Sequence, residues 1–163
     1  MTESPGHRDD DVDLLIDVWS RLLPDVDLTP LDVMSRLRRA SHRLAALRAR
    51  AFASAGLRSW EFDVLAALRR DEQGELSPSQ LIEATMIGSA AMTTRLDKLS
   101  GRNLIVRRPS PRDGRGVLVT ITPEGAERVD GAMRELARRE AEALAEVSRA
   151  DQATLARVLR ILS

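Results

Sequence analysis

Apolar residues recur at helical spacing over most of this chain. Near the N-terminus five of them share one face of a helix: Val12, Leu15, Ile16, Trp19 and Leu22. Pro24 ends that pattern, and a longer one starts at Thr29-Pro30, a pair suited to the first turn of a helix. Gly56 is a natural end for the second pattern. The spacing therefore predicts two N-terminal helices, of which the second is long.

The segment from residue 60 to residue 70 is apolar in almost every direction around a helix. Its apolar residues are Trp60, Phe62, Val64, Leu65, Ala66, Ala67 and Leu68. Such a helix is expected to be buried nearly all round, with Ser59 as its N-cap. Asp63 lies inside the segment, and a buried carboxylate is unfavourable unless a cation pairs with it.

Two short helical patterns follow and are separated by a turn. Ser77-Pro78 opens the first pattern, and residues 85–88 form the turn. Ser89 is expected to cap the second pattern, near residues 90–100. A helix, a short turn and a second helix are typical of a helix-turn-helix motif.

After residue 103 the pattern changes from helical to extended. Residues 104–106 and 117–121 have strong β preference and enclose a loop rich in arginine, proline and glycine. Thr122-Pro123 then opens a long amphipathic helix, and Asp151 begins a last one. The sequence thus predicts a mostly α-helical fold with a small β-hairpin. The terminal helices carry more apolar surface than a small core needs, which favours a homodimer.

Composition and charge narrow the functional classes. The chain has 163 residues, of which 43% are hydrophobic and 31% charged, as in a globular protein. Its formal net charge is zero, so any affinity for nucleic acid has to come from local clusters of charge. There is no apolar leader at the N-terminus and no apolar run near the roughly 20 residues that cross a bilayer. We therefore expect a soluble cytoplasmic protein without a membrane partner.

Candidate catalytic groups are few. The histidines are His7 and His42, and the chain contains no cysteine, no cluster of metal ligands and no glycine-rich phosphate loop. We therefore expect that the protein is not an enzyme and that it has no catalytic residue, no metal and no cofactor.

Positive charge gathers on the second helix of the motif and on the hairpin. Between Arg95 and Arg115 seven lysines and arginines stand against two aspartates, an excess of five positive charges in a neutral protein. Such a cluster is typical of phosphate contact, and a guanidinium beside the turn at Asp113-Gly114 can enter a minor groove. The alternative is a solvated hairpin whose arginines only keep an edge strand soluble. DNA contact is favoured because the loop directly follows a helix-turn-helix.

The helix near residues 90–100 has one apolar side and one small, polar side. Met92, Leu96 and Leu99 form the apolar side, which leaves the opposite side free to enter a major groove. We predict that ten residues of this helix and the hairpin contact double-stranded DNA: Ser89, Ala90, Ala91, Thr93, Thr94, Lys98, Arg108, Arg112, Asp113 and Arg115.

The hairpin and the residues after it resemble the wing of the MarR family of transcriptional regulators. The family's Asp-x-Arg pattern corresponds to Asp113 and Arg115, and its Leu-Thr-x-x-Gly pattern to residues 121–125, with Ile121 in place of leucine. Asn103 stands where the family usually has glycine, and asparagine can also adopt a left-handed turn. The resemblance covers roughly residues 31–162. It implies a winged helix-turn-helix repressor that binds a palindromic operator as a dimer.

Two further segments, residues 19–30 and 61–65, resemble the urate-responsive branch of that family, the PecS/MftR/HucR type. The resemblance implies a ligand site formed by Trp19, Asp63, Arg95 and Arg107. A planar anionic purine can stack on Trp19 while Arg95 donates to its oxygens. We hypothesise that an ion pair between Asp63 and Arg107 holds the DNA-binding geometry and that the ligand breaks it. Taken singly, Asp63 is more typical of a structural salt bridge and Trp19 of a packing anchor.

The chain is thus expected to contain four parts. They are a disordered tail (residues 1–8), N-terminal helices for dimerisation and for covering the ligand site (9–56), a winged helix-turn-helix (57–122) and C-terminal dimerisation helices (123–163). The expected ligand is a small anion such as urate or a related purine. One alternative is a MarR-type regulator that responds to a different aromatic acid, and another is a winged-helix protein-interaction module without its own operator.

Overall fold

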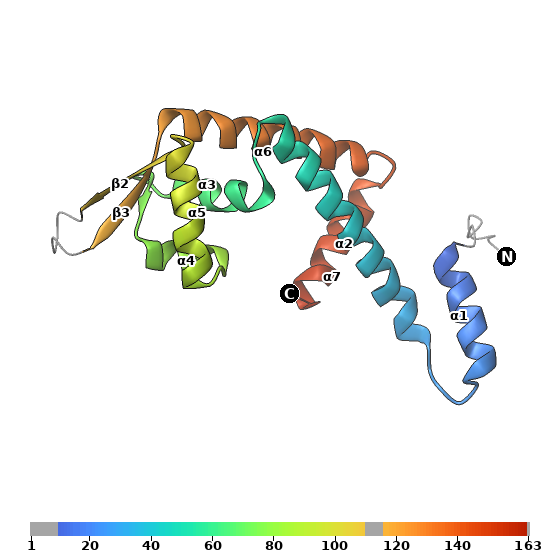
Figure 1. Cartoon of the computed structure of the whole chain (residues 1–163). Coiled ribbons are helices and arrows are strands. Elements are labelled where there is room, and N and C mark those ends of the chain that lie inside the picture. Colours follow the sequence, from blue (N-terminus) through green and yellow to red (C-terminus); the bar gives the residue numbers. More distant parts are fainter. Residues whose placement is uncertain (1–9, 110–115, 163) are drawn as a thin grey trace. The chain divides into compact units, whose positions relative to one another are not determined.

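The structure, a computed structural model, describes residues 10–109 and 116–162, which form helices and one small sheet (Figure 1). The elements run in the order α1 (Asp11–Leu22), α2 (Thr29–Ser54), α3 (Ser59–Arg70), β1 (Glu75–Leu76), α4 (Pro78–Thr85), α5 (Ser89–Gly101), β2 (Ile105–Pro109), β3 (Val117–Ile121), α6 (Pro123–Ala143) and α7 (Arg149–Leu162). The chain divides into two compact units, Met1–Ala46 and Leu47–Ser163. The predicted, mostly α-helical fold with a β-hairpin is confirmed.

Ion pairs join α1 to the start of α2 in the first unit. Asp10 caps α1, since its carboxylate accepts the Val12 N–H at 2.7 Å. The same carboxylate pairs with Arg36 of α2 at 3.0 Å, and Asp13 pairs with Arg36 at 2.8 Å. Only Val12 is buried within α1, so most of the apolar face predicted there is exposed to solvent, including Trp19.

The core of the second unit lies between α3 and the elements that surround it. Figure 1 shows α3, α4 and α5 beside the β2–β3 hairpin. The buried side chains come from every one of these elements and from α6, and include Val64, Leu65, Leu68, Leu81, Met92, Leu96, Leu99, Ile105, Val119, Val129 and Leu136. At the end of α2 the Phe52 ring stacks on Phe62 of α3, with ring centroids 3.9 Å apart. Each such side chain contributes about 1.5–3 kcal/mol when it leaves water.

The third helix differs from its prediction in two ways. It begins at Ser59 with Arg58 as its N-cap, so Ser59 is not the cap. It is also not buried all round, because Asp63 and the two arginines at its C-terminal end are exposed. The buried carboxylate is that of Glu61, whose side chain is 3% exposed.

Two other helix starts also moved by one or two residues. Gly88 is the N-cap of α5, so that Ser89 is its first helical residue. The last helix begins at Arg149 rather than Asp151, and the Ser148 hydroxyl accepts the Asp151 N–H at 3.1 Å. The predicted starts at Ser77 and Thr122 are confirmed, since each side chain accepts a backbone N–H of its first turn.

The sheet contains one strand that the sequence pattern did not predict. Its order is β1-β3-β2, and both pairings are antiparallel, with Leu76 opposite Val119 and Ile105 opposite Ile121. The chain enters β2 through Asn103, whose φ of 56° is the left-handed turn expected there. The hairpin is therefore attached to the helices through β1 and through the turn before β2.

The last long helix, α6, is fixed to α3 by an ion pair with two hydrogen bonds. Arg69 donates from Nε and Nη2 to the two carboxylate oxygens of Asp130, at 2.9 and 3.0 Å. These hydrogen bonds lower the pKa of Asp130 below its ordinary value.

Among residues 10–109 and 116–162 no helix has the length and apolar character to cross a membrane.

Candidate DNA-binding surface and effector site

The second helix of the motif, α5, separates a buried face from an exposed one as predicted. Met92, Leu96 and Leu99 are buried against the core. All six helix residues predicted to contact DNA are exposed: Ser89, Ala90, Ala91, Thr93, Thr94 and Lys98. The hydroxyls of Thr93 and Thr94 turn back to carbonyls one turn earlier, at 3.3 and 3.4 Å. A face of small side chains lets a helix approach the edges of base pairs closely.

Most of the arginines around this face are paired with carboxylates. Arg107 on β2 donates to Asp97 of α5 at 2.7 Å, and Arg102 donates to Glu61 at 2.6 Å. Arg108, a predicted DNA contact, pairs with Glu75 of β1. Among the described residues of this surface, Lys98 is the cation that is paired neither with a carboxylate nor with an aromatic ring. The predicted contacts Arg112, Asp113 and Arg115 lie outside the described residues.

The pairing of Arg108 depends on a side chain that sequence reasoning missed. Glu75 is 10% exposed, and it also accepts a hydrogen bond from the Thr120 hydroxyl at 3.0 Å. It lies on the two-residue strand β1, opposite Thr120 in the sheet. A strand of this length has no period to detect, so only the carboxylate itself could have pointed to the pairing.

Replacing Glu75 by glutamine is expected to strengthen DNA binding. The substitution removes the charge that holds Arg108, so the guanidinium becomes free to contact a phosphate. The affinity for duplex DNA should rise several-fold, and the slope of log affinity against log salt should steepen by about 0.9, the value for one phosphate. Glu83→Gln is the control, because it removes an exposed carboxylate of α4 without touching Arg108. Equal changes in both variants would mean that only net charge matters.

The four predicted effector residues lie in both units of the chain. Trp19, on α1, is 45% exposed and belongs to the first unit, and the other three belong to the second. Arg95 lies over the Trp60 ring, 5.4 Å from its centroid, which is within cation–π range. Arg95 thus has an aromatic partner that the sequence pattern did not predict.

The expected ion pair between Asp63 and Arg107 is wrong. Arg107 pairs with Asp97, and Asp63 is exposed, with no cation bound to it in the described part of the chain. Helical periodicity placed Asp63 among apolar neighbours, but it did not show that the side of α3 carrying Asp63 faces solvent. Among the described residues, the ion pair between the hairpin and α5 is therefore Arg107–Asp97.

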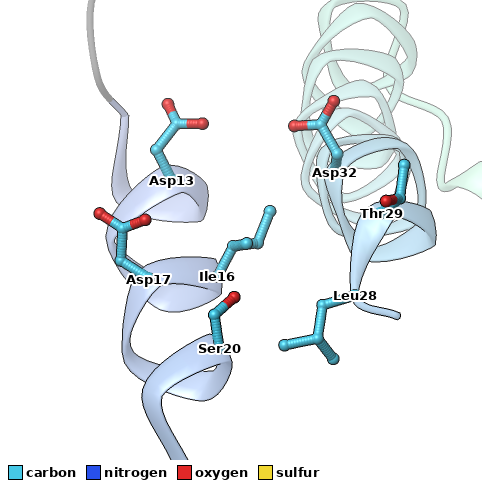
Figure 2. A pocket seen from close by; sticks show the side chains of 7 residues that line it. All are labelled: Asp13, Ile16, Asp17, Ser20, Leu28, Thr29 and Asp32. Carbon is cyan, nitrogen blue, oxygen red and sulfur yellow. The ribbon is translucent and has the colours of Figure 1, made fainter. Parts of the chain in front are cut away.

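A pocket of about 350 Å³ lies between α1 and the start of α2 in the first unit (Figure 2). Its lining residues are Asp13, Ile16, Asp17, Ser20, Leu28, Thr29 and Asp32. Three carboxylates give it negative potential, and two of them, Asp13 and Asp32, already pair with Arg36. Such a lining does not suit an anionic ligand.

A helix-turn-helix followed directly by a β-hairpin defines a winged-helix protein, and its similarity to known proteins identifies the family. Residues 55–116 match the MarR family. The chain is 31% identical over 146 residues to the transcriptional regulator PecS of Dickeya dadantii, covering 89% of this chain and 88% of PecS. It is 34% identical over 109 residues to the transcriptional repressor NicR of Pseudomonas putida, covering 64% of this chain and 68% of NicR. The protein belongs to the MarR family, whose members regulate transcription and are not enzymes.

The fold agrees with this family. The structure of BpsR from Bordetella bronchiseptica, 29% identical, superimposes with a TM-score of 0.66 over 80% of this chain and 91% of BpsR. The DNA binding of BpsR is regulated by 6-hydroxynicotinic acid. The predicted family is confirmed, and the predicted class of DNA-binding transcriptional regulator with it.

Proposed function

We propose that this protein is a cytoplasmic transcriptional repressor that binds a palindromic operator as a homodimer and leaves it when a small anionic ligand binds. The observation that carries the DNA-binding part is the exposed face of α5, where small residues and Lys98 stand opposite a fully buried apolar face. The wing residues Arg112, Asp113 and Arg115 complete the proposed contact surface, and Arg108 joins it when its pair with Glu75 opens.

The proposed dimer rests on apolar side chains that the single chain leaves uncovered. The last helix, α7, has no buried residue, and its Leu155, Ile161 and Leu162 are at least half exposed. Exposed apolar surface of this kind is typical of protein–protein interfaces. A second copy provides the complementary surface, with the segments 9–56 and 123–163 forming the contact. Two-fold symmetry then requires an operator with two related half-sites.

The proposed effector is urate or a related purine, bound through Arg95 and Arg107. Both guanidinium groups have replaceable partners, since Asp97 is 63% exposed and the Trp60 ring is uncharged. An anion that takes Arg107 from Asp97 breaks the link between the hairpin and α5, and it shifts the equilibrium only by binding that state better. Trp19 and Asp63 remain predicted ligand residues.

The second candidate effector is a different aromatic acid. The similarity to BpsR favours it, because the ligand that regulates BpsR is a hydroxylated aromatic acid. The other alternative, a protein-interaction module without an operator, is disfavoured by the family, and a salt titration tests it. Phosphate contacts give a steep dependence of DNA affinity on salt, whereas a protein-binding wing does not.

Thermal unfolding in the presence of candidate ligands identifies the effector. We expect urate to raise the melting temperature more than xanthine, hypoxanthine, salicylate or 6-hydroxynicotinic acid does. A ligand at 100 times its Kd stabilises the folded protein by about 2.7 kcal/mol, which corresponds to several degrees. The Arg95→Ala variant should lose this shift, and Trp19→Ala should reduce it.

Arg70→Ala is the matched control, because it removes an exposed arginine of α3 that is not assigned to the site. It should keep the full shift. A response to salicylate or 6-hydroxynicotinic acid alone would replace the purine by an aromatic acid. A full response in Arg95→Ala would remove Arg95 from the site.

A further inference from the structure

A carboxylate is buried at the N-terminal end of α3, and it belongs neither to the proposed DNA contacts nor to the effector residues. Among the residues that the structure describes, Glu61 is the one charged residue whose side chain is buried. Its Oε2 accepts the backbone N–H of Arg58 at 2.8 Å, and its Oε1 accepts a hydrogen bond from Arg102 at 2.6 Å. Both oxygens of the buried group are therefore satisfied, as burial of a charge requires.

The cationic partner, Arg102, is the C-cap of the recognition helix α5. Its Nη1 donates to Glu61, and its Nη2 donates to the carbonyl oxygen of Gly56 at 2.8 Å. Gly56 lies in the turn between α2 and α3. One guanidinium thus ties the C-terminal end of the recognition helix to that turn and to the first turn of α3.

The turn itself is held firmly. Gly56 has a φ of +68°, and the Leu57 N–H donates to the Phe52 carbonyl at 2.9 Å, which closes the end of α2. The stacked rings of Phe52 and Phe62 fix the two helices on either side. The turn is therefore a rigid reference for whatever is attached to it.

We propose that Glu61 and Arg102 are positioning residues that set the orientation of the recognition helix for DNA binding. Arg102 holds the C-terminal end of α5, while Arg107–Asp97 holds its middle to the hairpin. Two attachment points prevent α5 from rotating about either one. A buried ion pair often adds little net stability compared with apolar side chains but restricts geometry. This inference rests on the proposed DNA binding.

The competing role for Arg102 is a direct phosphate contact, since its side chain is 37% exposed. The two roles differ in their salt dependence. Loss of a phosphate contact flattens the slope of log affinity against log salt by about 0.9, whereas loss of orientation lowers affinity and leaves the slope unchanged. Glu61 is buried and negative, so any effect of its substitution on DNA binding has to act through Arg102 and the turn.

The test measures affinity and salt slope on one duplex, selected from a random-sequence pool by the unaltered protein. Arg102→Gln and Glu61→Gln are each expected to lower the affinity about tenfold, or about 1.4 kcal/mol, with an unchanged slope. Lys98→Gln is the reference variant and should flatten the slope by about 0.9. Because Glu61 and Arg102 act through one contact, the double variant should bind DNA as well as the single variant with the lower affinity does.

The opposite results are equally clear. A flatter slope in Arg102→Gln would make Arg102 a phosphate contact, and unchanged affinity in both glutamine variants would end the positioning role. If Lys98→Gln also changed nothing, the proposed DNA surface itself would be wrong. If melting curves show that the glutamine variants do not fold, Arg102→Lys decides. The lysine ammonium keeps the charge but reaches only one of the two acceptors of Arg102, the Glu61 carboxylate and the Gly56 carbonyl. Intermediate affinity for DNA therefore supports the proposal, and full affinity refutes it.

Discussion

Replacing Gly125 by alanine is expected to lower the free energy of unfolding by about 3 kcal/mol, the upper part of the range for overpacked interiors. Gly125 is buried in the first turn of α6, where the chain leaves the hairpin. A Cβ there would lie 2.2 Å from the Leu104 carbonyl oxygen and 3.0 Å from Ile121 Cγ1. The same carbonyl oxygen accepts a hydrogen bond from the Thr122 N–H, so it cannot move away without breaking that hydrogen bond. Thermal or denaturant unfolding measures the effect.

Gly131 on the same helix provides the matched control. A Cβ at Gly131 meets no atom within 4 Å in the described structure. Alanine there should stabilise the helix by about 0.5–1 kcal/mol, because glycine loses more conformational entropy on folding. Similar melting temperatures for Gly125→Ala and the unaltered protein would show that the α6 turn and the residue before β2 do not approach as closely as described.

Replacing Thr94 by glutamate is expected to lower affinity for the selected duplex by about 100-fold. Thr94 is exposed in the middle of the proposed contact face of α5, so a carboxylate there would oppose the phosphates across the groove. Like charges brought together in an interface cost several kcal/mol, and about 2.8 kcal/mol corresponds to the expected loss. Glutamate favours a helix more than threonine does, so folding should be unaffected. Fluorescence anisotropy measures the affinity.

Ser59→Glu is the control for net charge, since it adds the same charge at an exposed position of the first turn of α3. A carboxylate near a helix N-terminus is favourable, so this variant should fold and bind DNA normally. If the two glutamate variants lost affinity equally, the loss would come from overall charge. The face of α5 would then not be the contact surface.

The periodicity of apolar residues predicted most elements of this fold but not which charged residue is buried. Apolar positions in α5 were assigned correctly because Met92, Leu96 and Leu99 lie on one side of a regular helix. In the sequence of α3, apolar residues point in nearly all directions around the helix. Periodicity therefore could not decide whether Asp63 or Glu61 is the buried carboxylate. Glu61 is buried because Arg102, 41 residues later, approaches it, and such a contact has no local signal.

The electrostatics of the candidate site was the least predictable part. Counting charges between Arg95 and Arg115 located the surface that we propose as the DNA contact, but the count took no account of ion pairs. The one pair that we expected, Asp63–Arg107, is wrong. Arg108 is held by Glu75, 33 residues earlier, on a strand too short to show a pattern. Arg107 is held by Asp97, which lies in the counted segment but had no assigned partner. Chain topology, and not composition, decides which of these cations is available to a ligand.

The ion pairs of Arg102, Arg107 and Arg108 also bear on how such a regulator finds its operator. Sequence-independent attraction to the chromosome scales with the number of phosphates that a protein neutralises. Three arginines that are paired within the chain are expected to reduce that attraction, so that the protein would spend less of its time on random DNA. The ratio between operator occupancy and background occupancy then increases, which matters because a genome offers about a million or more competing sites. Fewer molecules per cell would then be needed to keep the proposed operator occupied.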